Sequence, residues 1–139
     1  MNTNLEIARS ILDTGAFTCV LCKEDRVYIS QYRGVKPLMT WLEKGTDLKD
    51  FSAADKVVGK ATAMLYSLLG VRELYAGVIS HAALEVLQEH NIPTSYGKLV
   101  DHIQNRAKTG LCPMESATLS IRDPKDAPAA IRAALEALK

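Results

Sequence analysis

The sequence predicts a three-layer α/β/α fold built around a mixed sheet. Segments with the 3.6-residue periodicity of amphipathic helices alternate with short apolar runs of strand length. Such alternation is typical of layered α/β proteins. One run, ELYAGVI at 73–79, is apolar almost throughout, as expected for a strand that a parallel sheet buries on both faces.

The N-terminal part of the chain predicts a helix followed by a β-hairpin. Residues 4–13 place their apolar side chains on one helical face, and Gly15 follows as a stop signal. The runs 16–22 and 26–30 are rich in β-branched and aromatic residues. The sequence KEDR separates them, which favours two antiparallel strands joined by a turn.

Helical patterns dominate the middle of the chain. A short helix is expected over 36–45, with a proline in its first turn. The longest helical pattern covers 52–69 and carries a wide apolar face. Ser52 is a typical N-cap for it, Asp55 stands three residues later as in a capping box, and Gly70 ends it.

The remaining elements follow the buried strand. Ser80 is a typical N-cap for the helix that comes next. A short strand is expected near 94–97 and a helical turn or two near 98–105. The segments 113–120 and 126–139 are expected to be helical.

Composition limits the range of functions. With 139 residues, of which 47% are hydrophobic and 24% charged, residues 1–139 suit a single domain. The net charge of +1 lacks the cationic excess of a dedicated nucleic-acid binder, so nucleic acid is not an expected partner. The sequence contains no run of 18 apolar residues, so no membrane span is predicted. The first residues do not resemble a signal peptide. Three cysteines are too few for a disulfide scaffold, so a cytoplasmic location is expected.

Cys19 and Cys22 form a C-x-x-C motif within the first expected strand. Residues three apart on a strand point to opposite faces, so the two sulfurs cannot share a metal ion or a disulfide there. No second C-x-x-C completes a four-ligand site. We interpret both cysteines as small core residues.

Cys112 and Glu115 lie in LCPME, which resembles part of the zinc motif of nucleoside and base deaminases. That motif pairs Pro-Cys-x-x-Cys with an upstream His-x-Glu. His81 begins a helix, but the next glutamate, Glu85, follows four residues later rather than two. A site of His81, Cys112 and Glu115 is chemically conceivable, because zinc accepts all three ligand types. The missing His-x-Glu and second cysteine nevertheless favour a protein without zinc, so neither metal nor other cofactor is expected.

The order of the elements resembles the cytidine deaminase-like fold. In that fold the first helix after the hairpin carries His-x-Glu, and the next strand leads into a helix that starts with Pro-Cys-x-x-Cys. By that alignment the zinc positions fall near ADKVVGK and at ISHAAL, and neither stretch offers the ligands.

The chain also resembles a prokaryotic domain-of-unknown-function family with this fold. The resemblance lies in AADKVVGKA (53–61), GVIS (77–80) and the segment NR…LCPME (105–115). It covers most of the chain and implies the fold, but it implies no particular activity. Relatives with this fold usually associate, and symmetric dimers are the commonest oligomers, so a homodimer is expected.

The stretch DKVVGK suggests an anion site at the start of the helix expected over 52–69. Lys56 and Lys60 are four residues apart and would share a helix face. Free N–H groups and the positive end of the helix dipole favour an anion there. Gly59 costs a helix roughly 1 kcal/mol relative to alanine, which is explained if something packs closely against its backbone. The alternative is that both lysines belong to a solvated face and that Asp55 only caps the helix.

Three further groups are candidates for the same crevice. Ligands of parallel α/β sheets bind beyond the carboxyl ends of strands, where Ser80 and His81 follow the buried strand. Cys112 precedes a proline and is expected at a helix N-cap, an environment that makes thiols reactive, although a buried inert cysteine is the alternative. Asn105 and Arg106 could reach a carboxylate or phosphate, or lie on the surface.

The expected ligand is an anionic, nucleotide-like small molecule. The expected catalytic residues are Cys112, His81 and Glu115, and the expected ligand-binding residues are Asp55, Lys56, Gly59, Lys60, Ser80, Asn105 and Arg106. Two alternatives remain open at this point: a non-catalytic module that senses a metabolite, and a divergent zinc-dependent deaminase. Whether the protein is an enzyme is likewise left open.

Overall fold

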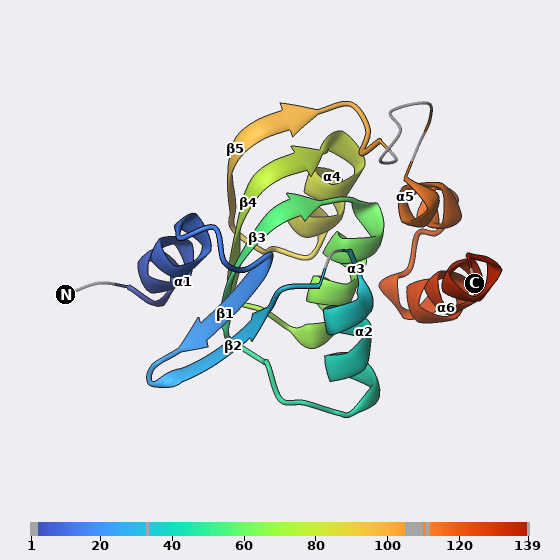
Figure 1. Ribbon diagram of the computed structural model, residues 1–139. Helices are drawn as coiled ribbons and strands as arrows, with labels where there is room; N and C mark the ends of the chain where they lie inside the picture. Colours follow the sequence, from blue (N-terminus) through green and yellow to red (C-terminus); the bar gives the residue numbers. More distant parts are fainter. Residues whose placement is uncertain (1–2, 33, 105–109, 111, 139) are drawn as a thin grey trace.

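The computed structural model describes residues 3–32, 34–104, 110 and 112–138, and it is built around one mixed five-stranded sheet. The strand order is β2-β1-β3-β4-β5 (Figure 1). Strand β1 pairs antiparallel with both β2 and β3, whereas β3, β4 and β5 run parallel. The strands are β1 (Cys19–Lys23), β2 (Arg26–Ser30), β3 (Ser52–Val58), β4 (Glu73–Ser80) and β5 (Thr94–Val100).

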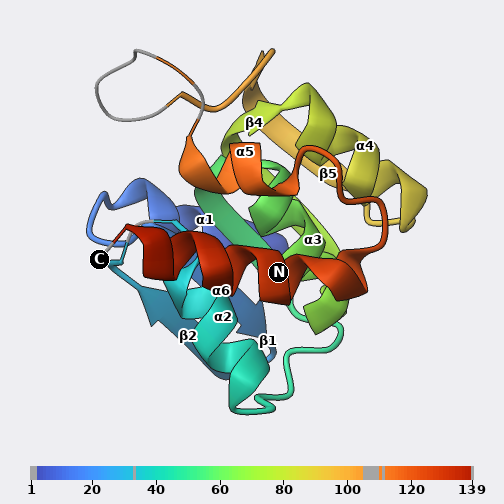
Figure 2. The same cartoon turned by 90° about the vertical axis from the view of Figure 1, so that its right-hand side faces the viewer.

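Helices cover both faces of this sheet and confirm the α/β/α layering. Helix α1 packs against β1 and β3 on one face, and α2, α3 and α4 lie on the other (Figure 1). Helices α5 and α6 pack on α3, and α6 crosses in front of α2 and α3 in Figure 2. The helices are α1 (Asn4–Asp13), α2 (Lys36–Glu43), α3 (Lys60–Leu69), α4 (His81–Glu89), α5 (Pro113–Thr118) and α6 (Ala127–Ala137).

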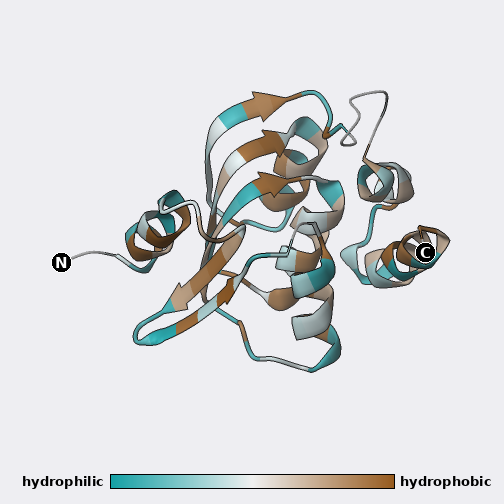
Figure 3. Ribbon diagram, viewed as in Figure 1, coloured by the Kyte–Doolittle hydropathy of each residue, from teal (hydrophilic) through white to brown (hydrophobic). Residues whose placement is uncertain are grey.

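The apolar core is divided by the sheet. The larger cluster lies between the sheet and α2–α4 and includes Leu21, Phe51 and Met64. A smaller cluster lies under α1. Hydrophobic residues concentrate in the strands, and the helices mix both kinds (Figure 3). Cys19 belongs to the larger cluster and Cys22 to the smaller one, so the expectation that these thiols face opposite sides is confirmed.

The single helix expected over 52–69 is wrong. Residues 52–58 form the central strand β3, Gly59 is the N-cap, and the helix begins at Lys60. The mixture of alanine, aspartate and lysine favours a helix locally, but pairing with β1 on one side and β4 on the other overrides that propensity. Gly59 was the available signal, because a glycine inside a helical pattern often marks a boundary.

The second difference concerns β5. The expected strand near 94–97 extends to Val100, and residues 98–100 are part of it rather than a helical turn. The hairpin and the helices expected near the two termini and after Ser80 are confirmed within a few residues. The helix end at Gly70 is confirmed too, since this residue adopts the left-handed conformation with φ of 76°.

Two glycines allow the parallel strands to approach one another at the middle of the sheet. A Cβ atom at Gly77 would lie 2.7 Å from the carbonyl oxygen of Lys56, and one at Gly97 would lie 2.9 Å from the carbonyl oxygen of Gly77. Both obstacles are backbone atoms of a neighbouring strand, so neither can move independently. The close passage of β3, β4 and β5 therefore requires glycine at both positions.

The substitution Gly77→Ala is expected to lower the free energy of unfolding by about 1–3 kcal/mol, because the added methyl forces a shift of β3 against β4. Urea denaturation measures the change. Gly110→Ala is the matched control, since nothing lies within 4 Å of a Cβ atom built there. Equal stability of the two variants would contradict the steric explanation.

Candidate functional site

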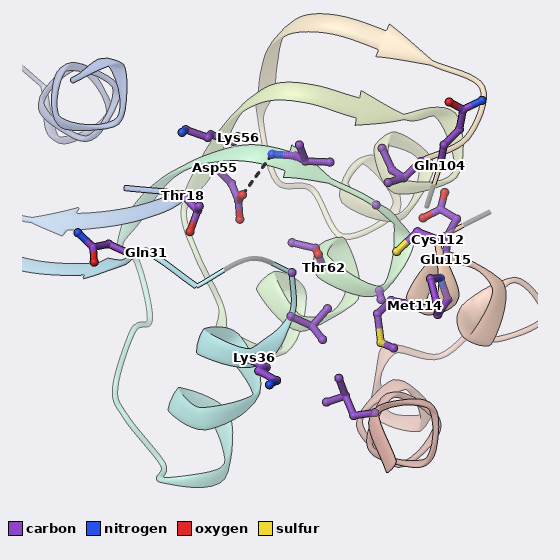
Figure 4. Close-up of a pocket in the computed structure, with 18 of the residues that line it drawn as sticks. Thr18, Gln31, Lys36, Asp55, Lys56, Thr62, Gln104, Cys112, Met114 and Glu115 are labelled. Carbon is purple, nitrogen blue, oxygen red and sulfur yellow. Dashed lines mark hydrogen bonds between the residues drawn. The ribbon is translucent and has the colours of Figure 1, made fainter. Parts of the chain in front are cut away.

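A cavity of about 940 Å³ opens where α2, α3 and α5 begin (Figure 4). It lies beside the carboxyl end of β3, the position where parallel α/β sheets bind ligands. Its walls combine apolar and polar side chains with two acids. The lining residues include Phe17, Thr18, Gln31, Lys36, Asp55, Lys56, Gly59, Thr62, Ile103, Gln104, Cys112, Met114 and Glu115.

Asp55 is a buried acid of the cavity wall that is held by a chain of hydrogen bonds from the core. Its side chain lies on β3, and the residue is 7% exposed. Tyr66 Oη donates to Asp55 Oδ2 at 2.7 Å, and the backbone N–H of Val57 donates to Oδ1 at 3.3 Å. Cys19 Sγ lies 3.0 Å from Tyr66 Oη. A buried chain Cys19–Tyr66–Asp55 thus runs from the core to the cavity.

Burial raises the pKa of Asp55 from its ordinary value of 3.8 to about 7, although hydrogen bonds from Tyr66 and the backbone oppose the shift. Burial also raises the pKa of Tyr66 and of Cys19, so both stay neutral at pH 7. Asp55 therefore exchanges its proton near neutral pH. Carboxyl groups of this kind are typical of functional sites.

Glu115 is the second acid, and it joins α5 to α3. The residue is 1% exposed, and its Oε2 accepts a hydrogen bond of 2.7 Å from the backbone N–H of Lys60. A Cβ atom at Gly59 would overlap Glu115 Oε2. This carboxylate is the group that packs closely against the backbone of Gly59, as the sequence led us to expect. Glu115 Oε1 is buried and has no hydrogen-bond partner among the described residues.

The lysines expected to act together are separated. Lys56 lies on β3, not on a helix, and its side chain extends away from the cavity in Figure 4. Lys60 begins α3, but its ammonium group donates to the carbonyl oxygen of Leu119 at 2.8 Å. The prediction that both lysines share a helix face is wrong, because Lys56 lies on a strand, where successive side chains point to opposite faces, and the helix starts only after Gly59.

Ser80 and His81 do not line the cavity. Ser80 is buried and caps α4, with its Oγ accepting from the N–H of Ala83 at 3.2 Å. The His81 side chain is 58% exposed and lies 3.6 Å from a carboxylate oxygen of Asp101. A site that joins His81 to Cys112 and Glu115 is therefore not assembled, and the described residues contain no group of three His, Cys, Asp or Glu side chains that could hold a metal ion.

Cys112 does lie at the cavity. It is the N-cap of α5, is partly buried, and its sulfur points toward the cavity in Figure 4. Its backbone N–H donates to the carbonyl oxygen of Ile103, which ties α5 to the segment after β5. Asn105 and Arg106 lie outside the described residues.

Three lining or supporting residues escaped sequence analysis. Tyr66 lies on the buried face of α3, where the sequence pattern does not distinguish a tyrosine from other core residues. Lys36 begins α2, and Thr62 lies in the first turn of α3. The sequence feature that could have indicated Lys36 is its position directly before a proline in the first turn of a helix, which places Lys36 at the N-terminus of that helix.

Comparison with known proteins identifies the family. The family model TM1506, a domain of unknown function (DUF1893), matches residues 7–135. The chain belongs to the DUF1893 family. The family match includes all the described residues that line the cavity except Leu138. No functionally curated protein matches the sequence significantly.

A solved structure of the DUF1893 family shares this fold. The crystal structure of a DUF1893 family protein (TM1506) from Thermotoga maritima is similar with a TM-score of 0.85 and 24% identity, over 96% of this chain and 91% of that one. A diaminohydroxyphosphoribosylaminopyrimidine deaminase/5-amino-6-(5-phosphoribosylamino)uracil reductase from the same organism gives a TM-score of 0.43 and 16% identity, over 75% of this chain and 34% of that one. A likeness of that degree carries no information about activity. Within the described part of the chain, every helix is too short or too polar to cross a membrane.

Stability is expected to depend on pH through Asp55. The folded protein holds this proton up to about pH 7, whereas the unfolded chain releases it near pH 3.8. The stabilising contribution is therefore complete below pH 3.8 and is lost as the pH rises to about 7, by up to ~4 kcal/mol. Urea denaturation from pH 4 to 8 measures the free energy of unfolding. As the pH rises, this free energy should fall in the wild type relative to Asp55→Asn. Asp47→Asn, at an exposed carboxylate, is the control; the same pH dependence in all three proteins would contradict the assignment.

Proposed function

We propose that the cavity binds a nucleotide-like small molecule through Asp55. The observation that carries the proposal is this buried carboxyl group, held by Tyr66 at the wall of an otherwise open cavity. With Oδ2 bonded to Tyr66, Oδ1 is the oxygen that can accept from an amino group on a ring, because its hydrogen bond from the N–H of Val57 is long at 3.3 Å. The volume of about 940 Å³ lies within the range of small-molecule sites.

The other lining residues suit the two ends of such a ligand. Phe17, Ile103 and Met114 offer apolar surface for a ring. Lys36 is exposed at the start of α2, where the helix dipole and free N–H groups add positive potential for a phosphate or carboxylate. The anion is therefore assigned to Lys36, in place of the Lys56 and Lys60 pair that the sequence suggested.

Chemical transformation of the ligand is a second candidate function. Asp55 exchanges its proton near neutral pH, as a general acid or base requires. Cys112 lines the same cavity, and its thiol would be the nucleophile. A metabolite sensor would use the same contacts without turnover. Incubation of the protein with a bound ligand, followed by NMR for new products that Asp55→Asn fails to make, separates the two functions.

Binding is expected to strengthen from adenosine to AMP by about tenfold, because the phosphate gains a charge-assisted contact with Lys36. Isothermal titration calorimetry measures both affinities. Lys36→Gln should remove the difference between the two ligands, and Asp55→Asn should weaken both. Lys44→Gln, an exposed lysine at the other end of α2, is the control and should bind as the wild type does. Binding that is insensitive to Asp55→Asn would contradict the proposed site.

We also propose a cytoplasmic homodimer. Strand β2 is a sheet edge that pairs only with β1, and Val27 and Ile29 on it are 46% and 45% exposed. Antiparallel pairing of two copies about Tyr28 would set Val27 opposite Ile29 of the second copy and continue the sheet. Free thiols at the three cysteines support a reducing compartment.

Light scattering at micromolar concentration should therefore give the mass of two chains. Ile29→Lys is expected to yield the monomer mass, because a charge on the edge strand opposes pairing. Tyr96→Lys, an exposed aromatic on the opposite edge strand, is the control and should remain dimeric. A wild-type monomer, or a dimer lost only in the control, would count against pairing through β2.

A further inference from the structure

Glu115 has one oxygen more than its structural role uses. Only Oε2 takes part in capping α3, where it accepts a hydrogen bond of 2.7 Å from the N–H of Lys60. Oε1 is buried and has no hydrogen-bond partner among the described residues. An unpaired buried oxygen of a charged group is costly, so the position is explained if a donor arrives from outside the fold.

The side chain of Lys60 does not provide that donor. The ammonium group of Lys60, the residue whose backbone N–H it caps, donates instead to the carbonyl oxygen of Leu119 at 2.8 Å. Glu115 lines the same cavity as Asp55. The cavity therefore presents two buried carboxyl groups. Glu115 has one oxygen without a partner among the described residues, and Asp55 has one oxygen, Oδ1, whose hydrogen bond from Val57 is long at 3.3 Å.

We propose that Glu115 Oε1 is a second recognition group of the cavity and selects a heterocycle that carries two amino groups. This inference rests on the proposed function, because it assumes that the ring binds at Asp55. An amino group supplies N–H donors and no acceptor that two carboxylates would repel, whereas a ring carbonyl at the same position would face Oε1 oxygen to oxygen. Selection by buried hydrogen bonds is strong, because an analogue that lacks the donor leaves the acceptor unpaired.

Three ribosides on one purine scaffold test the proposal: purine riboside, adenosine and 2,6-diaminopurine riboside, with no, one and two amino groups. The wild type is expected to bind each about tenfold more tightly than the one before it, as measured by isothermal titration calorimetry. Glu115→Gln keeps an oxygen to accept from Lys60 but places an N–H₂ group where Oε1 was. It should abolish the gain from the second amino group.

The control variants separate this inference from the proposed function. Asp55→Asn should abolish the gain from the first amino group. Thermal unfolding of Glu115→Gln checks that this variant is folded. If the variant does not fold, the order of the three affinities in the wild-type protein still tests the proposal. A second amino group that adds less than twofold in the wild type, or a gain that survives in folded Glu115→Gln, overturns the role of Glu115 alone. Failure of all three ribosides to bind overturns both proposals.

Discussion

The hydrogen bond from the backbone of Lys60 to Glu115 is the constraint on which the site depends. It fixes the start of α5 against the start of α3 and so places Cys112 and Met114 on the cavity wall. The contact exists only because residue 59 has no side chain: a Cβ atom there would occupy the position of Glu115 Oε2. One glycine at the end of a central strand therefore determines both where α3 begins and where the C-terminal helices dock.

A second constraint lies four residues before Gly59, on β3. Asp55 changes protonation near pH 7, and the hydroxyl group of Tyr66 can serve either form. When Asp55 is ionised, Tyr66 donates to it and accepts from the Cys19 thiol; when Asp55 is protonated, Tyr66 can accept from it and donate to the sulfur. The chain Cys19–Tyr66–Asp55 therefore has a satisfied arrangement for each state. Burial alone would favour only the neutral carboxyl.

Periodicity predicted the layering, the hairpin, the buried strand β4 and the helices near both termini, because those segments combine a clear pattern with a stop signal. It failed at residues 52–58, where local propensity is helical and the strand is stabilised by partners distant in sequence. That error moved Lys56 to the wrong element and hid the role of Asp55 on β3. Cys112 and Glu115 were predicted for one crevice and do line the cavity, but Ser80 and His81 were predicted there too and do not line it. Tyr66 and Lys36 required the fold.

The two buried acids are poor choices for stability alone. Asp55 destabilises the fold as it ionises, and Glu115 keeps a buried oxygen without a partner among the described residues. An asparagine at 55 could accept from Tyr66, and a glutamine at 115 could cap α3, and neither would place an ionisable group in the interior. Functional sites are where such local costs are typically found, since groups tuned for a ligand are not tuned for the empty protein. The coincidence of both costs in one cavity is the strongest physical argument that this cavity binds a ligand.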